Sequence, residues 1–287
     1  MTVPNSDDKL AVFCDFENVA LGVRDAKIAK FDMQLVLERL LLKGSIVVKK
    51  AYCDWERYKE FKTAMHGAAF ELIEIPHTRQ SGKNSADIRM VVDALDLCYT
   101  KEHIDTFVII SGDSDFSPLV SKLRENAKTV IGVGVRNSTS DLLMNNCDEF
   151  IFYDDLVPDD APKRKASPKA PAKDKAPAAK GKAEKAPEAA AKAAAKDAAA
   201  KPTDPYAEAI DLVLETAAAM LAEGSDRVWG SAVKQTLKRR RPGFSESSYG
   251  FRSFSDLLEE AEERGLLDME MDERSGGYVI RSVRHDD

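Results

Sequence analysis

The chain has 287 residues, 44% of them hydrophobic and 32% charged, and a formal net charge of −7. This length is enough for about two domains and a linker, and the acidic balance excludes an overall basic field that would mark a nucleic-acid partner. The four cysteines are scattered without a C-x-x-C pair, which indicates small buried residues in a reducing compartment rather than a disulfide framework or a zinc site. No apolar run approaches the roughly 18 residues of a membrane span, and the polar, acidic first residues do not fit a secretory signal. We therefore expect a cytoplasmic protein that does not enter a membrane.

Strand-like and helix-like segments alternate along the first part of the chain. Apolar and β-branched runs predict strands at residues 10–14, 45–53, 70–75, 106–110, 129–135 and 149–153. Helical periodicity predicts helices at residues 33–42, 56–66, 85–99, 117–126 and 140–146. This alternation predicts one α/β domain over residues 8–157, with a parallel sheet and helices on both faces. The lack of G-x-G-x-x-G and G-x-x-x-x-G-K-[ST] motifs argues against a dinucleotide site and a P-loop NTPase.

Several aspartates fall where predicted strands end. Asp15 follows the first strand, Asp113 and Asp115 follow the strand at 106–110, and Asp87 is expected at the start of the helix after the third strand. The carboxyl ends of parallel strands meet at one edge of a sheet, where open α/β folds bind ligands. Crowded carboxylates repel one another unless a cation or a proton lies among them, and oxygen donors suit Mg²⁺ or Mn²⁺ better than zinc. We therefore predict a divalent metal site, with the alternative that Asp113 begins a tight turn and Asp115 caps the next helix.

Such a site would let a bound metal activate a water molecule and stabilise charge on a phosphodiester. Asn18 either orients a ligand or the attacking water, or closes the first strand with an Asx turn. Lys83 either holds a scissile phosphate or is an ordinary exposed lysine. Asp93 lies six residues past Asp87, and therefore on a different helix face, so we expect it to be structural.

The composition changes abruptly to alanine, lysine and proline over residues 158–203. Alternating KAP and AAK units cannot build a core, so we predict a flexible linker. Its lysines either keep the segment soluble or bind phosphate backbones without regard to sequence, and both interpretations stay open.

A second, smaller domain is expected over residues 204–283. Periodicity predicts three helices, at residues 206–221, 231–238 and 254–264, followed by strands at 266–271 and 278–283. Three helices followed by a hairpin is the plan of a winged-helix domain. A charged and aromatic patch there is a candidate RNA-binding surface, made of Lys234, Lys238, Arg239, Arg240, Arg241, Tyr249 and Arg252. The alternative is a solvated helix end next to core aromatic residues.

Four stretches of the first domain together resemble an NYN domain, the PIN-like nuclease branch that includes LabA-like proteins. They are AVFCDFENV (11–19), GKNSADIRMVVDAL (82–95), VIISGDSDFSPLV (108–120) and NCDEFIFYDDL (146–156). The resemblance implies a PIN-like fold and Mg²⁺- or Mn²⁺-dependent ribonuclease activity in the cytoplasm. It implies metal-binding acids at Asp15, Asp87, Asp113 and Asp115, with Asn18 beside Asp15.

The second domain resembles an OST-HTH (LOTUS) domain. The residues that carry this resemblance are Gly230-Ser231, Pro242-Gly243-Phe244, Tyr249-Gly250-Phe251, Phe254-Ser255-Asp256-Leu257-Leu258 and Gly276-Gly277-Tyr278. The resemblance implies RNA binding and, in some members, docking of protein partners.

The leading hypothesis is a metal-dependent ribonuclease whose C-terminal domain binds RNA. The alternative is a non-catalytic RNA-binding adaptor that retains the nuclease fold. A third hypothesis, a phosphohydrolase of the haloacid-dehalogenase type, needs an aspartate two positions after its nucleophile. Asp15 is followed instead by Phe16 and Glu17, which argues against that chemistry.

Overall fold

The structure is a computed structural model that describes residues 8–28, 31–75, 82–157, 205–222, 227–272 and 276–284. The predicted linker at 158–203 lies outside the described residues. Within these ranges, no helix is both long enough and apolar enough to cross a membrane.

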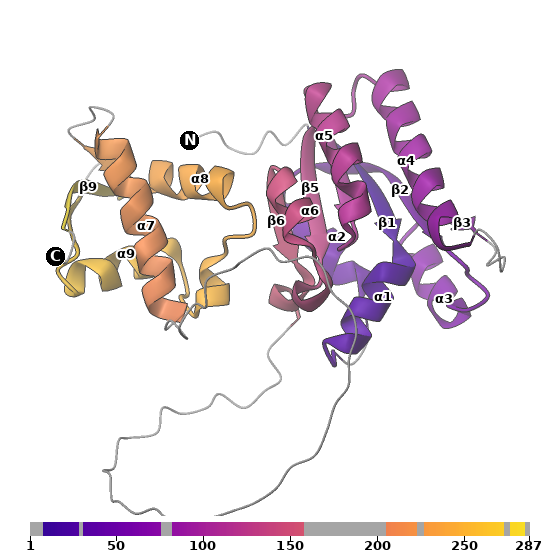
Figure 1. Cartoon of the computed structure of the whole chain (residues 1–287), viewed down its shortest axis with the longest axis horizontal. Coiled ribbons are helices and arrows are strands. Elements are labelled where there is room, and N and C mark those ends of the chain that lie inside the picture. Colours follow the sequence, from indigo (N-terminus) through magenta and orange to yellow (C-terminus); the bar gives the residue numbers. More distant parts are fainter. Residues whose placement is uncertain are drawn as a thin grey trace, which may run out of the picture. The chain divides into compact units, whose positions relative to one another are not determined.

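A parallel sheet forms the centre of the N-terminal domain (Figure 1). Its strands are β1 (Lys9–Asp15), β2 (Ser45–Cys53), β3 (Glu71–Glu74), β4 (Thr106–Ile110), β5 (Thr129–Gly134) and β6 (Glu149–Phe152). The strand order is β3-β2-β1-β4-β5-β6, and every neighbouring pair is parallel. The order reverses between β1 and β4, which lie next to each other although 90 residues of chain separate their ends at Asp15 and Thr106. The predicted parallel α/β sheet is confirmed.

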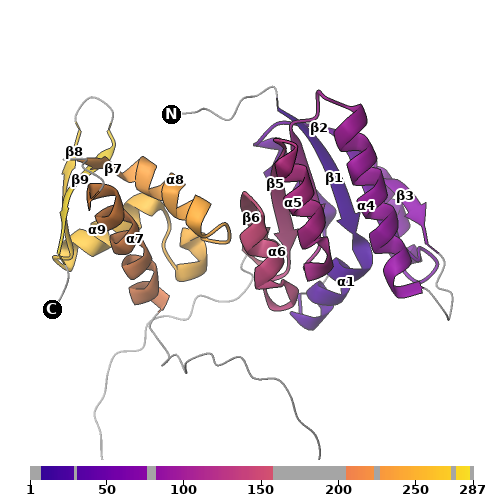
Figure 2. The ribbon, with the colours of Figure 1, turned by 45° about the horizontal axis from the view of Figure 1, so that its top comes forward.

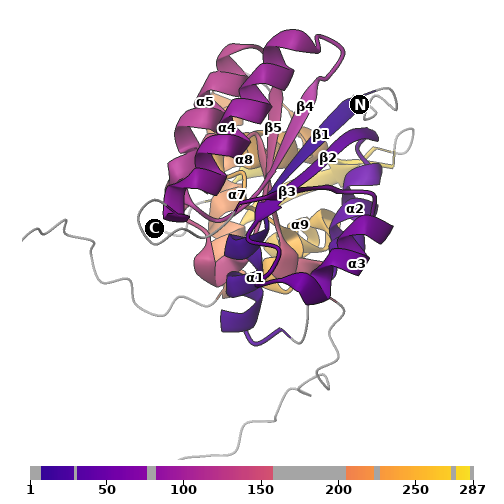
Figure 3. The ribbon, with the colours of Figure 1, turned by 90° about the vertical axis from the view of Figure 1, so that its right-hand side faces the viewer.

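Helices cover both faces of this sheet (Figure 3). The helices on one face are α1 (Phe16–Asp25), α2 (Met33–Leu41) and α3 (Lys59–Gly67). The helices on the other face are α4 (Gly82–Thr100), α5 (Ser117–Glu125) and α6 (Asp141–Asn146). Strand β1 shows why the sheet is apolar on both sides: Leu10 and Val12 face the first set of helices, while Ala11 and Phe13 face the second. A strand buried on both faces reads as a continuous apolar run, as this one does.

Helix α1 and the start of α4 differ from the sequence-based expectations for the N-terminal domain. Helix α1 was not predicted, although Phe16, Val19 and Val23 recur at helical spacing and are buried. The helix expected at residue 85 begins three residues earlier, at Gly82, so the expected position of Asp87 at the helix start is wrong. Asp87 lies in the second turn of α4 instead.

The C-terminal domain combines three helices with a small antiparallel sheet (Figure 2). Its elements are α7 (Pro205–Ala222), β7 (Val228–Trp229), α8 (Gly230–Arg240), α9 (Phe254–Glu263), β8 (Leu267–Met271) and β9 (Tyr278–Val283). The sheet order is β7-β9-β8. Ile210, Val213, Leu237, Leu257 and Ile280 are buried in its core. The predicted winged-helix domain is confirmed, and β7, only two residues long, is the strand that was not predicted.

Candidate functional site

The candidate site lies at the carboxyl edge of the sheet, where β1 and β4 end side by side. Asp15 is the last residue of β1, and Ser111, Gly112 and Asp113 follow β4 directly. The loop after β1 leads to α1 on one face of the sheet and the loop after β4 leads to α5 on the other. In open α/β folds, such a reversal of strand order is where the ligand-binding crevice lies.

Asp15 is the most buried acid of this edge, with 8% of its surface exposed. Its side chain caps the start of α1, since Oδ1 accepts a hydrogen bond from the backbone N–H of Asn18 at 3.3 Å. Its other oxygen, Oδ2, accepts a hydrogen bond from the hydroxyl of Ser111 at 3.0 Å. The carboxyl group is therefore held in place by one residue of α1 and one residue of the loop after β4.

The environment of Asp15 disfavours its charged form. Burial, the largest cause, and the negative charges of Asp87 and Asp113 together raise the pKa of the Asp15 carboxyl from 3.8 to about 7, although the hydrogen bonds from Asn18 and Ser111 oppose the increase. These interactions place the carboxyl groups of Asp15, Asp87 and Asp113 within electrostatic reach of one another. A cation in the crevice would offset this repulsion and favour the ionised acids.

The loop after β4 is tied to α1 by a second hydrogen bond. The side-chain oxygen of Asn18 accepts from the N–H of Gly112 at 2.9 Å, across 94 residues of sequence. Asn18 therefore fixes this loop rather than forming the Asx turn considered from the sequence. Only glycine fits at position 112, because a Cβ atom there would lie 2.3 Å from the carbonyl oxygen of Ser138.

Ser111 is a site residue whose position in the sequence fits either a hydrogen bond to the acids or an ordinary turn. It is fully buried, and its hydroxyl donates to Asp15 while accepting the N–H of Asp113 at 3.2 Å. One hydroxyl thus links two of the candidate acids. The available signal was a serine-glycine pair between a buried strand and an acid, which is also ordinary turn chemistry.

The loop acids Asp113 and Asp115 were interpreted either as metal ligands or as a tight turn with a helix cap, and the structure shows that Asp113 does cap a turn. Oδ1 of Asp113 accepts the N–H of Asp115 at 3.0 Å and so caps the short 3₁₀ turn η1 (Ser114–Phe116). Asp115 is exposed and lines an open groove beside α5 and α6. The side chain of Lys83, the predicted phosphate contact, lies outside the described residues.

Helix α4, which carries Asp87, is anchored to the sheet through Asp93. The hydroxyl of Tyr52 donates to Asp93 at 2.9 Å, and Nε of Arg89 donates to the same carboxylate at 3.1 Å. Tyr52 is the β2 residue that pairs with Asp15 of β1. The structural role expected for Asp93 is therefore to hold α4 against the strands that end at the site.

The donor chemistry of the site fits a hard divalent cation, since Asp15, Asp87 and Asp113 offer carboxylate oxygens, and one of these groups is buried among negative charges. Within the described residues, however, no three or more His, Cys, Asp or Glu side chains lie together closely enough to hold a metal ion as they stand.

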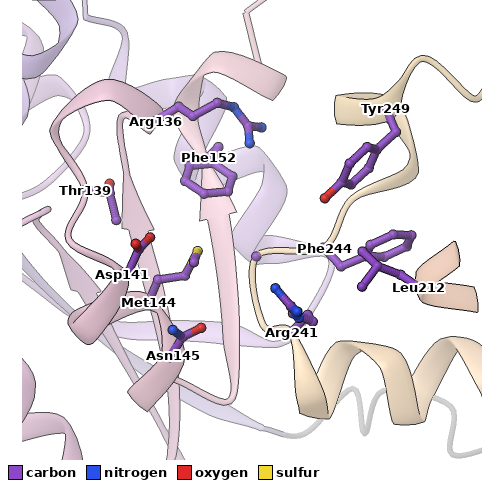
Figure 4. Close-up of a pocket in the computed structure, with 11 residues that line it drawn as sticks. Arg136, Thr139, Asp141, Met144, Asn145, Phe152, Leu212, Arg241, Phe244 and Tyr249 are labelled. Carbon is purple, nitrogen blue, oxygen red and sulfur yellow. The ribbon is translucent and has the colours of Figure 1, made fainter. Parts of the chain in front are cut away.

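The predicted RNA-binding residues of the C-terminal domain fall into two groups. Several are engaged within the domain: Lys234 pairs with Glu246, Arg240 pairs with Glu215, and the Tyr249 ring stacks on Phe244 with centroids 5.5 Å apart. Figure 4 shows Phe244 and Tyr249, as well as Arg136 of the N-terminal domain over the ring of Phe152.

The second group is more accessible. Lys238 is half-buried, and the exposed members are Arg239, Arg241 and Arg252. These three arginines are the strongest candidates for contacts with a phosphate backbone. Lys234 and Arg240, by contrast, would first have to break their ion pairs with Glu246 and Glu215.

Comparison with known proteins finds two family matches along the chain. Residues 9–154 match the NYN domain, and residues 208–264 match the OST-HTH/LOTUS domain. The chain is 28% identical over 120 residues to an uncharacterized protein of Methanocaldococcus jannaschii, MJ0482. The aligned stretch covers 42% of this chain and 47% of that protein. The chain thus spans about half the length of this curated relative. The crystal structure of a Vibrio parahaemolyticus protein of unknown function, VPA0982, shares 27% sequence identity with a TM-score of 0.47, covering 53% of this chain and 96% of that one.

Proposed function

Because the chain belongs to the NYN domain family and also carries an OST-HTH/LOTUS domain, we propose that it is a metal-dependent ribonuclease that hydrolyses phosphodiester bonds of RNA. The observation that carries the proposal is Asp15, a buried carboxyl group at the point where the strand order reverses, with a raised pKa and two further acids in electrostatic reach. Perturbed acids in such a crevice are typical of sites that bind metal and perform acid–base chemistry.

Asp15, Asp87 and Asp113 would hold Mg²⁺ or Mn²⁺, and Asp115 stays a predicted fourth ligand. When bound, the ion supplies the positive charge that activates water and stabilises a phosphodiester under attack. The residues of the chain itself hold the acids in position. Ser111 donates to Asp15, and Asn18 fixes the backbone that carries Asp113.

The C-terminal domain would bring RNA to this site. Exposed Arg239, Arg241 and Arg252 support phosphate binding there, and a protein partner of this domain is a further prediction. We place the activity in the cytoplasm, where the four free and buried cysteines would stay reduced.

The test is cleavage of labelled single-stranded RNA and DNA oligonucleotides by the purified full chain, with EDTA, Mg²⁺ or Mn²⁺. We expect RNA products only with metal, and none from Asp113→Asn at any metal concentration. Asp96→Asn is the matched control, since this exposed aspartate lies on α4 away from the acids. Unchanged cleavage by a folded Asp113→Asn protein would overturn the assignment.

The second candidate function is a non-catalytic RNA-binding adaptor, which the exposed Arg239, Arg241 and Arg252 would serve equally well. An adaptor would bind RNA with an affinity that falls steeply with salt and would release no product with any metal. The same oligonucleotide assay therefore separates the two functions. The haloacid-dehalogenase hypothesis gains no support, because position 17 holds a glutamate where that chemistry needs an aspartate.

A further inference from the structure

An open groove of about 620 Å³ begins beside the candidate acids. Its lining residues come from η1, the first half of α5 and the start of α6, and they are Ser114, Asp115, Ser117, Pro118, Ser121 and Leu142. Helices α5 and α6 pack against each other in the same domain (Figures 1 and 2). Ser114 follows Asp113 directly, so a molecule in this groove would lie next to the proposed reaction site.

A buried hydroxyl in this groove is left unsatisfied. Ser117 is 5% exposed, and its Oγ finds no hydrogen-bond partner within the described part of the chain. Buried polar groups are almost always hydrogen-bonded, and one that is not calls for a water or a ligand. The neighbouring hydroxyl of Ser121 donates to the Ser117 carbonyl at 3.1 Å. Ser114, Ser117 and Ser121 recur at helical spacing and therefore share one face.

The charge of the groove excludes a phosphate group. None of its lining residues is a lysine, arginine or histidine, and Asp115 contributes an exposed carboxylate. Two backbone N–H groups at this helix start are also engaged: that of Asp115 donates to Oδ1 of Asp113, and that of Ser117 donates to the carbonyl of Ser114. The groove therefore suits a neutral group that carries hydroxyls.

The groove also offers an apolar surface. Leu142 is 59% exposed, and Pro118 on α5 is an exposed residue of the same groove. A nucleobase has apolar faces, and the ribose beside it carries a 2′-hydroxyl that both donates and accepts hydrogen bonds. A ribonucleoside therefore matches the two chemical halves of the groove, apolar side chains and serine hydroxyls.

We propose that this groove binds the base and ribose of a nucleotide next to the cleaved bond, and that the Ser117 hydroxyl, which is buried in this structure, turns about its Cα–Cβ bond into the groove to bind the ribose 2′-hydroxyl. The groove would then make the chain prefer RNA to DNA. This inference rests on the proposed function, because it names the part of the substrate that the same site recognises.

The test measures binding by the full chain in EDTA, so that cleavage does not enter. The probes are fluorescein-labelled oligouridine and its 2′-deoxy counterpart, followed by fluorescence anisotropy. For Ser117→Ala we expect RNA affinity to fall about fivefold, the loss of one hydrogen bond. We expect its DNA affinity to be unchanged and its melting temperature to be equal or higher, because the variant removes an unsatisfied hydroxyl.

A second variant tests the groove at an exposed side chain, so the test does not rest on the buried Ser117 alone. Leu142→Ala should weaken RNA and DNA binding alike, about threefold, because it removes apolar contact with the base. Leu41→Ala is the matched control, since Leu41 is also 59% exposed but lies on α2, on the other face of the sheet. The control should bind both oligonucleotides like the wild type.

The outcomes separate this inference from the proposed function. Wild-type affinities and RNA preference in both Ser117→Ala and Leu142→Ala would overturn the groove, even if the chain cleaves RNA. Selective loss of RNA binding in Ser117→Ala would support the groove, even if the wild type cleaves nothing.

Discussion

Replacing Asp15 by asparagine should stabilise the N-terminal domain at neutral pH while it abolishes cleavage. Asparagine has nearly the same shape and keeps an oxygen that can accept the hydrogen bond from Ser111 or from the Asn18 backbone. It removes a carboxyl group whose charged form is disfavoured by burial and by Asp87 and Asp113. Functional residues often lower stability in this way.

The size of the effect follows from the pKa of Asp15. An increase from 3.8 to about 7 on folding corresponds to ~4 kcal/mol between the two protonation states. Below pH about 4 the carboxyl is protonated in both the folded and the unfolded chain, so the neutral form makes its full contribution. Between these two pKa values the folded chain binds more protons, and stability therefore falls as the pH rises. Above pH about 7 the whole contribution is lost, and asparagine should be more stable by up to ~4 kcal/mol.

The measurement is urea unfolding of the full chain in EDTA across this pH range. Trp55 and Trp229 are the two tryptophans of the chain, so a Trp229→Phe background leaves Trp55 to report on the N-terminal domain alone. Trp55 is 1% exposed and packs on the Phe16 ring at 5.0 Å, next to Asp15. Adding Mn²⁺ should stabilise wild type and narrow the difference, because an ion that binds only the folded chain stabilises it.

Asp96→Asn in the same background is the control, since this exposed carboxyl group should leave the pH profile unchanged. If the profiles of wild type and Asp15→Asn run parallel from pH about 4 to about 8, the carboxyl of Asp15 does not titrate as its burial requires. If Asp15→Asn is the less stable protein at pH 8, its hydrogen bonds outweigh the buried charge. Either result refutes the electrostatic argument.

Two further predictions concern backbone conformation, one at the loop after β4 and one at the positive-φ glycine of the C-terminal domain. Asn18→Ala leaves the Gly112 N–H without its acceptor, so we expect the free energy of unfolding measured with urea to fall by about 1–3 kcal/mol. We also expect a lower kcat with an unchanged Kd for RNA. An unaltered kcat would show that the loop keeps its position without this hydrogen bond. Gly250→Ala places a Cβ atom at a φ of +87°, 2.7 Å from the Tyr206 hydroxyl, and should lower the stability of the C-terminal domain by about 1–2 kcal/mol or more; thermal melting followed through circular dichroism checks this, and an unchanged melt would contradict it.

Much of the fold was accessible from local pattern. Runs such as residues 106–110 are continuously apolar, which is typical of strands buried on both faces. These runs alternate along the chain with segments of helical periodicity, and that alternation is enough to predict a parallel sheet with helices on both sides. Acids that directly follow such strands must lie at the carboxyl edge, so the placement of Asp15 and Asp113 needed no structure. Helix α1 was missed because its first residues also read as a polar loop after the strand.

The partners of these acids were decided by tertiary structure. Whether β1 lies beside β4 is a matter of strand order, and the hydrogen bonds from Ser111 to Asp15 and from Gly112 to Asn18 exist only because those strands are neighbours. Burial, and with it the raised pKa of Asp15, depends on the same arrangement. Local pattern determines where an element ends and what it carries, because those are properties of a few consecutive residues. Which side chains meet across about a hundred residues depends on how the sheet assembles, which no short stretch encodes.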